Sequence, residues 1–111
     1  MSLVKWSVAQ NYCSELYTDL AVILSYTDWI RLNKVTASKG LTKAAWVGLY
    51  NDVNSWRWSL YDLPLKNVTY TYWYNGEPDN NNGIESCVAV RDYGMWSDYD
   101  CTLYKPFICY N

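Results

Sequence analysis

The stretch NGEPDNNNGIES, at residues 75–86, brings three carboxylates together in a segment without helical or strand periodicity. Glu77 and Asp79 flank one proline, and Glu85 follows a run of turn-forming residues. The surrounding region is acidic as well, because residues 77–100 hold six acids and one base in a chain whose net charge is −2. An acidic patch of this kind attracts cations or hydroxyl groups. It is the opposite of the basic surface with which proteins bind nucleic acid.

The residue types argue against catalysis. The sequence contains no His and no nucleophile motif, so it offers no recognisable set of catalytic groups. A glycosidase pair needs two carboxylates about 5–9.5 Å apart across a cleft, with the pKa of one raised by burial. Glu77 and Asp79, separated by a single proline in an acidic loop, do not match that arrangement. We therefore predict a binding protein rather than an enzyme.

Four cysteines, at positions 13, 87, 101 and 109, allow three disulfide pairings. Their spacing contains no CxxC motif and the chain has no His, so structural zinc and thioredoxin-like chemistry are poor interpretations. Two disulfides in an extracellular domain fit better. The sequon at Asn67 is an N-glycosylation acceptor compatible with that compartment. No run of roughly 18 apolar residues occurs, so we predict no membrane contact by this domain.

The 111 residues suffice for a single domain, 1–111, with a modest core. Apolar residues at helical spacing predict a first helix over about residues 5–17. The capping-box pattern of Ser25 and Asp28 predicts a second helix that continues to about Ala37.

Strands follow the helices along the chain. Residues 19–23 form a short buried strand or lead into the second helix. Further strands are predicted at residues 45–50, 56–60, 87–92, 95–98 and 106–110. Helices that come before strands favour the α+β class with a mainly antiparallel sheet. Residues 61–86 keep no regular pattern, and a loop of this length in a compact domain is usually functional.

Three pieces of the sequence together resemble the C-type lectin-like domain. They are WSVAQNYC in the first helix, WVGL at residues 46–49, and the closing ESCVAV…GMWSDYDC…PFICY. The resemblance covers nearly the whole chain. It implies an α+β fold of two helices packed on two small antiparallel sheets, with a long calcium-site loop projecting from the second. It also implies two disulfides, Cys13 with Cys109 and Cys87 with Cys101.

One departure from the family concerns the start of the chain. Members normally carry a strand before the first helix that pairs with the C-terminal strand, whereas few residues precede Trp6 here. We therefore expect this first strand to be missing or trimmed. The C-terminal PFICYN would then keep an open edge, which invites pairing with another chain. A dimer contact through this edge strand is the corresponding prediction.

In sugar-binding members of the family, five side chains hold calcium, and the Glu–Pro peptide bond among them is cis. Calcium takes six to eight oxygen ligands at about 2.3–2.6 Å, which suits carboxylates. Matched to this sequence, the metal and sugar ligands are Glu77, Asp79, Glu85, Ser97 and Asp98. Trp73 is a further candidate sugar contact, because an aromatic ring in a loop can stack on a sugar. We expect Trp46 and Trp96 to lie in the core instead.

Two positions weaken the expected sugar affinity. Glu77 and Asp79 leave no amide beside the proline, and Ser97 stands where the family has Asn. A serine hydroxyl is shorter and a poorer ligand. The predicted function is a calcium-dependent carbohydrate-recognition module of an extracellular protein, secreted or the ectodomain of a receptor, with a glycan as ligand. The alternative, favoured by Ser97, is a protein-binding module of the same fold in which calcium is structural or absent.

Overall fold

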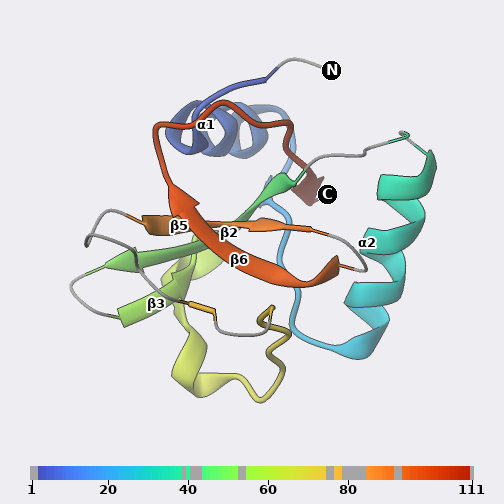
Figure 1. Cartoon of the computed structure of the whole chain (residues 1–111), viewed down its shortest axis with the longest axis vertical. Coiled ribbons are helices and arrows are strands. Elements are labelled where there is room, and N and C mark those ends of the chain that lie inside the picture. The colour runs from blue at the N-terminus through green and yellow to red at the C-terminus, as the bar shows by residue number, and fades with distance from the viewer. Residues whose placement is uncertain are drawn as a thin grey trace.

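The computed structural model describes residues 3–38, 40, 44–52, 55–74, 77–78, 85–91 and 94–110. These residues form two α-helices packed on antiparallel sheets (Figure 1). The helices are α1 (Trp6–Leu16) and α2 (Tyr26–Ser38), with short 3-10 helices η1 (Leu60–Asp62) and η2 (Leu65–Asn67). The strands are β1 (Asp19–Leu20), β2 (Ala45–Asp52), β3 (Ser55–Trp58), β4 (Leu63–Pro64), β5 (Glu85–Val90), β6 (Trp96–Asp100) and β7 (Cys109–Tyr110).

Both helices form where the sequence predicts them. Ser25 Oγ accepts a hydrogen bond from the Asp28 N–H at 3.3 Å, and the Asp28 carboxylate accepts one from the Leu24 N–H at 3.0 Å. The first bond confirms Ser25 as the residue that caps α2, whereas the reciprocal bond of the capping box reaches Leu24, one residue before Ser25. On α1, the buried residues Ala9 and Cys13 lie four apart and therefore face the core together.

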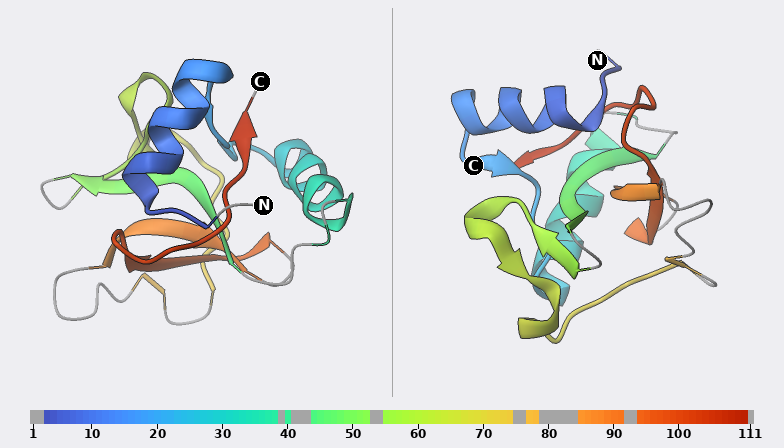
Figure 2. Two further views of the ribbon diagram at one scale, coloured as in Figure 1. Left: turned by 90° about the horizontal axis from the view of Figure 1, so that it is seen from above. Right: turned by 90° about the vertical axis from the view of Figure 1, so that its left-hand side faces the viewer.

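The larger sheet has the strand order β4-β3-β2-β5-β6, and the smaller sheet pairs β1 with β7. All the pairings between these strands are antiparallel. Figure 2 shows β7 running between the two helices in one view and α1 lying along β1 and β7 in the other. The predicted α+β class with two helices on two antiparallel sheets is confirmed.

The bounds of the predicted strands differ by a few residues from those observed, and two of the differences have a structural reason. The predicted strand 106–110 is reduced to β7, because Phe107 forms an isolated parallel bridge with Trp46 instead of joining β1. The predicted strand 56–60 ends two residues early, where the chain turns into η1. The segment 61–86 is more regular than predicted, since it contains most of η1 together with β4 and η2.

The strand β2 is the centre of the core and buries side chains on both of its faces. Val47 and Leu49 belong to a cluster on one face that includes Trp58 and Trp96. Trp46 points to the other face and packs with the buried residues of α1. Trp46 and Trp96 are both fully buried, which confirms that they are core residues.

The two disulfides follow the pairing that the family resemblance implies. Cys13 of α1 is joined to Cys109 of β7, and Cys87 of β5 is joined to Cys101, directly after β6. Their Cα–Cα distances are 5.3 and 5.1 Å, which are usual for disulfides. The first bridge ties α1 to the small sheet, and the second closes the hairpin of β5 and β6.

Among residues 3–5, which the structure describes before α1, Val4 forms an isolated bridge. Val4 and Lys105 exchange backbone hydrogen bonds of 3.0 and 2.9 Å. β7 pairs with β1 on one side, and within the described part of the chain no strand pairs with its other side. Among the described residues this edge is unpaired, and a dimer contact through it stays a prediction.

Candidate functional site

The segment that leads into the acidic stretch pairs with the outer edge of β6. The Trp96 N–H donates to the Tyr72 carbonyl at 2.8 Å, and the Tyr74 N–H donates to the Trp96 carbonyl at 2.7 Å. Trp73 and Trp96 therefore form an isolated parallel bridge. The Glu77 N–H then donates to the Tyr74 carbonyl at 2.8 Å, which closes a turn. This turn is thus anchored to the strand that carries the last two of the predicted ligands.

The described part of the loop includes one of its three predicted carboxylates. The Glu77–Pro78 peptide bond is cis, as the family resemblance implies. Glu77 is half-buried and Pro78 is exposed. Asp79 lies outside the described residues, and so does the side chain of Glu85, whose backbone opens β5. The convergence of the loop carboxylates on one point stays a prediction.

Ser97 and Asp98 lie in the middle of β6, and each is 2% exposed. Ser97 pairs with Ala89 and Asp98 pairs with Val88. Successive side chains of a strand point to opposite faces, so the Ser97 hydroxyl and the Asp98 carboxylate leave β6 in opposite directions. One ion could contact both residues only at the edge of the strand. Ser97 Oγ has no hydrogen-bond partner among the described residues, so this buried hydroxyl has capacity for a further bond.

The donor types at these positions suit calcium in their chemistry. Glu77 and Asp98 offer carboxylate oxygens and Ser97 offers a hydroxyl, and hard cations prefer oxygen ligands. Among the side chains that the structure describes, no three His, Cys, Asp or Glu residues gather at one point. That set does not include Asp79 or Glu85, which supply the other two carboxylates of the predicted site.

The aromatic residues beside the turn are packed against the fold. Trp73 is half-buried, and its ring centroid lies 5.2 Å from that of Trp56 and 5.4 Å from that of Trp96, to which it packs edge-to-face. Only the part of Trp73 left open by this packing could contact a sugar. Tyr74 is exposed, and the Arg91 guanidinium lies 4.1 Å from its ring centroid in a cation–π contact. Sequence reasoning missed Arg91, although it is the one base of the acidic region.

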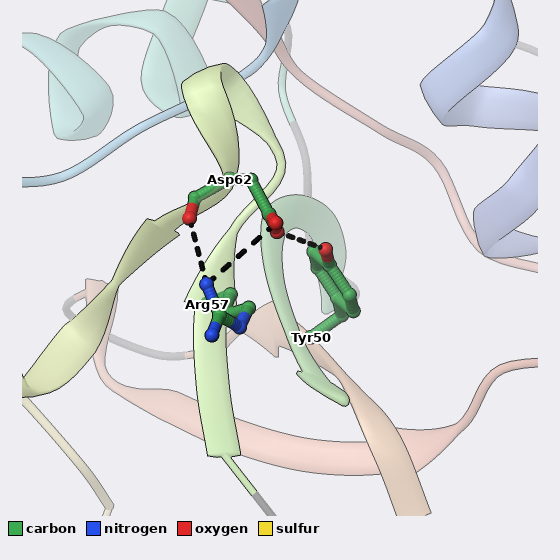
Figure 3. A network of polar contacts seen from close by, with 3 residues as sticks. All are labelled: Tyr50, Arg57 and Asp62. Carbon is green, nitrogen blue, oxygen red and sulfur yellow. Dashed lines mark hydrogen bonds and ion pairs between the residues drawn. The ribbon is translucent and has the colours of Figure 1, made fainter. Parts of the chain in front are cut away.

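A second polar network, also missed from the sequence, joins η1 to the sheet. The Tyr50 hydroxyl donates to Asp62 Oδ1 at 2.6 Å, and Arg57 Nη1 donates to the Asp62 carbonyl at 3.0 Å (Figure 3). Arg57 Nη1 also lies 3.6 Å from Asp62 Oδ2. Tyr61 and Asp62 have φ angles of 58° and 52°, which non-glycine residues rarely adopt. The network stabilises this turn through contacts that no local sequence motif predicts.

Comparison with known proteins identifies one family. Residues 2–111 match the sequence model of the family described as the Lectin C-type domain. The chain is 33% identical to C-type lectin 1 of Hydrophis hardwickii, over 97% of this chain and 68% of that protein. It spans about half the length of two other relatives, a hepatic lectin and ladderlectin.

Two solved structures share the fold. The carbohydrate-recognition domain of the mouse scavenger receptor C-type lectin has a TM-score of 0.80 and 26% identity, covering 95% of this chain and 80% of that one. The cow CD23 carbohydrate-recognition domain, determined in the presence of a GlcNAc2Man3 oligosaccharide, has a TM-score of 0.76 and 27% identity. That match covers 92% of this chain and 74% of the cow chain.

These relatives bear on one of the sequence predictions. C-type lectins are carbohydrate-binding proteins without enzymatic activity, which confirms the prediction of a non-enzyme.

Neither α1 nor α2, the helices that the structure describes, combines the length and the apolar character that crossing a bilayer requires.

Proposed function

This chain belongs to the C-type lectin domain family, and we propose that it is a calcium-dependent carbohydrate-recognition domain of an extracellular protein, secreted or the ectodomain of a receptor. Members of the family bind glycans, and the cow CD23 structure was determined with an oligosaccharide present. The observation that carries the proposal is the pairing of residues 72–74 with β6. It anchors the turn at Glu77 to the strand that holds Ser97 and Asp98.

In this proposal, calcium has five side-chain ligands: Glu77, Asp79, Glu85, Ser97 and Asp98. When bound, the ion supplies an electrophilic centre that accepts two hydroxyl oxygens of a sugar. The carboxylates accept hydrogen bonds from the same hydroxyls, and Ser97 is the one neutral donor of the set. Ser97 is the weakest of the five ligands, because its neutral hydroxyl is shorter and a poorer ligand than a carboxylate.

The sugar affinity of this site is reduced for a chemical reason. A sugar hydroxyl that ligates the ion also accepts hydrogen bonds, and neither flank of Pro78 offers an amide to donate them. A hydrogen bond between neutral groups is worth about 0.5–1.5 kcal/mol, so the missing amide donors weaken monosaccharide binding. Trp73 adds the open part of its ring as a stacking surface. Asn67 is exposed at the end of η2, and we propose that it carries an N-linked glycan.

A protein-binding role of the same fold is the second candidate, with calcium structural or absent. Ser97 favours it, because the residue lacks the amide that a sugar needs. The contact between Tyr74 and Arg91 favours it as well, since Tyr and Arg are enriched in protein interfaces.

The test of calcium binding is a thermal melt in calcium and then in excess EDTA. A ligand that binds only the folded state at a hundred times its dissociation constant adds about 2.7 kcal/mol of stability. We expect calcium to raise the Tm of the wild type and to raise it less for Asp98→Asn. The exposed acid Glu15 of α1 provides a matched control, since Glu15→Gln should keep the full shift. A wild-type Tm that calcium does not change would refute the calcium site.

The test of sugar binding is a glycan array that compares the wild type with Ser97→Asn. The substitution restores the amide of the family pattern, so we expect it to strengthen both calcium and glycan binding. A calcium-dependent Tm shift without glycan binding by either protein would support the protein-binding role.

A further inference from the structure

The outward face of α1 carries an apolar stripe that the proposed function does not use. Val8, Tyr12 and Leu16 follow one another at four-residue spacing and are 49%, 45% and 63% exposed. Residues four apart lie on the same face of a helix. The neighbouring Ala9 and Cys13 are fully buried. One side of α1 therefore faces the core, and an adjacent apolar side faces solvent.

The stripe continues onto the segments that flank the helix. The ring centroid of Tyr12 lies 5.3 Å from that of Phe107, to which it packs edge-to-face, and 6.5 Å from that of the exposed Tyr17. At the start of the helix, Lys5 Nζ lies 6.0 Å from the ring centroid of the exposed Tyr104. Exposed apolar side chains that gather on one surface are a feature of interaction sites. We call it the α1 patch, and it consists of Val8, Tyr12, Leu16, Tyr17 and Tyr104.

Charges of opposite sign stand at the two ends of the stripe. Lys5 directly precedes α1, Glu15 lies in its last turn, and both are exposed. Tyr12 and Glu15 are three residues apart and share one side of the helix, while Lys5, the N-cap with an extended backbone, lies beside Tyr104 at the start of the helix. Within the part of the chain that the structure describes, neither Lys5 nor Glu15 takes part in an ion pair.

We propose that the α1 patch is the interface of a homodimer in which two copies of α1 pack antiparallel about a two-fold axis. A two-fold axis that lies on the patch side of the helix, level with Gln10, brings Lys5 opposite the partner's Glu15 and Val8 opposite the partner's Tyr12. Both pairings follow from the same axis, because residues 5 and 15 and residues 8 and 12 are placed symmetrically about residue 10. A surface that complements itself in this way is what a two-fold contact requires.

The area that a stable dimer needs indicates which residues must take part, and the position of α1 favours this contact. A standard interface buries about 800 Å² per partner, roughly one eighth of the 6469 Å² surface of this chain. A helix of 11 residues is only about 16 Å long, so Tyr17 and Tyr104 must contribute as well. In Figure 1, α1 lies at the opposite end of the molecule from the segment that precedes Glu77. The dimer would thus leave both candidate ligand sites free, and two linked sites bind a multivalent ligand more tightly than one.

The experiment is a charge exchange read by sedimentation equilibrium at low ionic strength and in EDTA. Lys5→Glu places like charges together at both ends of the contact, and Glu15→Lys does the same. We expect each single variant to raise the dimer dissociation constant about tenfold, because like charges across an interface are unfavourable. The double variant Lys5→Glu/Glu15→Lys should return to within about threefold of the wild type, since the opposite pairs are restored.

Two further variants complete the design, and thermal melts verify that every variant is folded. Tyr12→Ser should also raise the dissociation constant about tenfold, because it removes a central aromatic contact. Lys34→Glu, a charge change on the exposed side of α2, should leave it unchanged. A monomeric wild type, or a double variant as weak as the single ones, would overturn the proposal. A dimer that none of the α1 changes weakens would also overturn it and would favour the edge of β7. Because calcium is removed, none of these results depends on the proposed lectin site.

Discussion

The Tyr50 hydroxyl on β2 donates a 2.6 Å hydrogen bond to the carboxylate of Asp62, 12 residues further along the chain. The acceptor lies in a backbone conformation that non-glycine residues rarely adopt, with φ at 52°. Such a conformation persists only where its surroundings hold it. In this domain the hydrogen bond from Tyr50 on the central strand stabilises the conformation. Arg57 of β3 adds a second hydrogen bond, to the Asp62 carbonyl.

This relationship predicts an energetic coupling between the two side chains. Tyr50→Phe removes the donor, and Asp62→Gly removes the acceptor while keeping the positive φ acceptable. A double-mutant cycle measured by urea denaturation should give a coupling free energy of about 1 kcal/mol. The control cycle pairs Asp62→Gly with Tyr104→Phe, for which we expect no coupling. Equal coupling in the two cycles would contradict a direct bond.

Gly48 stands where a β-carbon would collide with the fold. A Cβ there would lie 2.7 Å from Ser59 Oγ and 3.2 Å from the Ala21 carbonyl oxygen. Ser59 Oγ itself donates a 2.7 Å hydrogen bond to the buried Asp19 carboxylate. We expect Gly48→Ala to lower the free energy of unfolding by about 1–3 kcal/mol. Combined with Ser59→Ala, the loss should be smaller than the sum of the two single losses, and strict additivity would argue against this collision.

The buried hydroxyl of Ser97 predicts an effect that depends on calcium. Ser97→Ala removes a hydroxyl that lacks a partner among the described residues, and an unpaired buried group costs about 1–3 kcal/mol. In EDTA, the variant should therefore melt at a higher temperature than the wild type. In calcium this advantage should shrink, because the hydroxyl is then a ligand. The exposed Ser14→Ala should stay within about 0.5 kcal/mol of the wild type in both buffers.

Lys105 predicts a pH dependence of stability at the alkaline side. Its ammonium group lies 3.8 Å from the Tyr99 ring centroid, and burial lowers its pKa below the usual 10.5. Between the lowered pKa and 10.5 the unfolded chain binds more protons, so this residue makes stability increase with pH. The free energy of unfolding of the wild type minus that of Lys105→Met should therefore rise through this window. Urea titrations of both proteins at several pH values check it.

The comparison with Lys105→Met is necessary because another group acts in the opposite direction. Burial, and then the neighbouring Tyr72 and Tyr26, raise the pKa of Tyr70 above 10. Above pH 10 the unfolded chain loses this proton first, so stability falls with pH. A difference between wild type and Lys105→Met that falls across the window would show that burial does not disfavour the charged lysine.

Local signals in the sequence suffice for the helices. The start of α2 follows from Ser25 and Asp28, because the two partners of a capping box are three residues apart. The disulfides are different, since four cysteines alone leave three pairings open. The family resemblance selected Cys13 with Cys109, and no spacing rule could have done so.

The contacts that shape the candidate site left little trace in the sequence. The pairing of residues 72–74 with β6 uses backbone groups alone, so no particular side chain in the sequence predicts it. The positive φ at Tyr61 has no local signal, since neither Gly nor Asn stands there. The opposite directions of Ser97 and Asp98, by contrast, follow from strand alternation once β6 is assigned. The family pattern treats the two residues as equal ligands.

The Cys13–Cys109 bridge spans 96 residues of the sequence. A force that pulls on the two ends of the chain therefore passes from α1 to β7 through the sulfur atoms. Only the 12 residues before the bridge and the two after it can be drawn out, which adds roughly 50 Å at about 3.5 Å per residue. Without this bridge, and with Cys87–Cys101 intact, the same chain could extend to roughly 340 Å. The sheet that carries the candidate ligand site thus lies within the loop that the bridge closes, so a force on the chain ends does not load it.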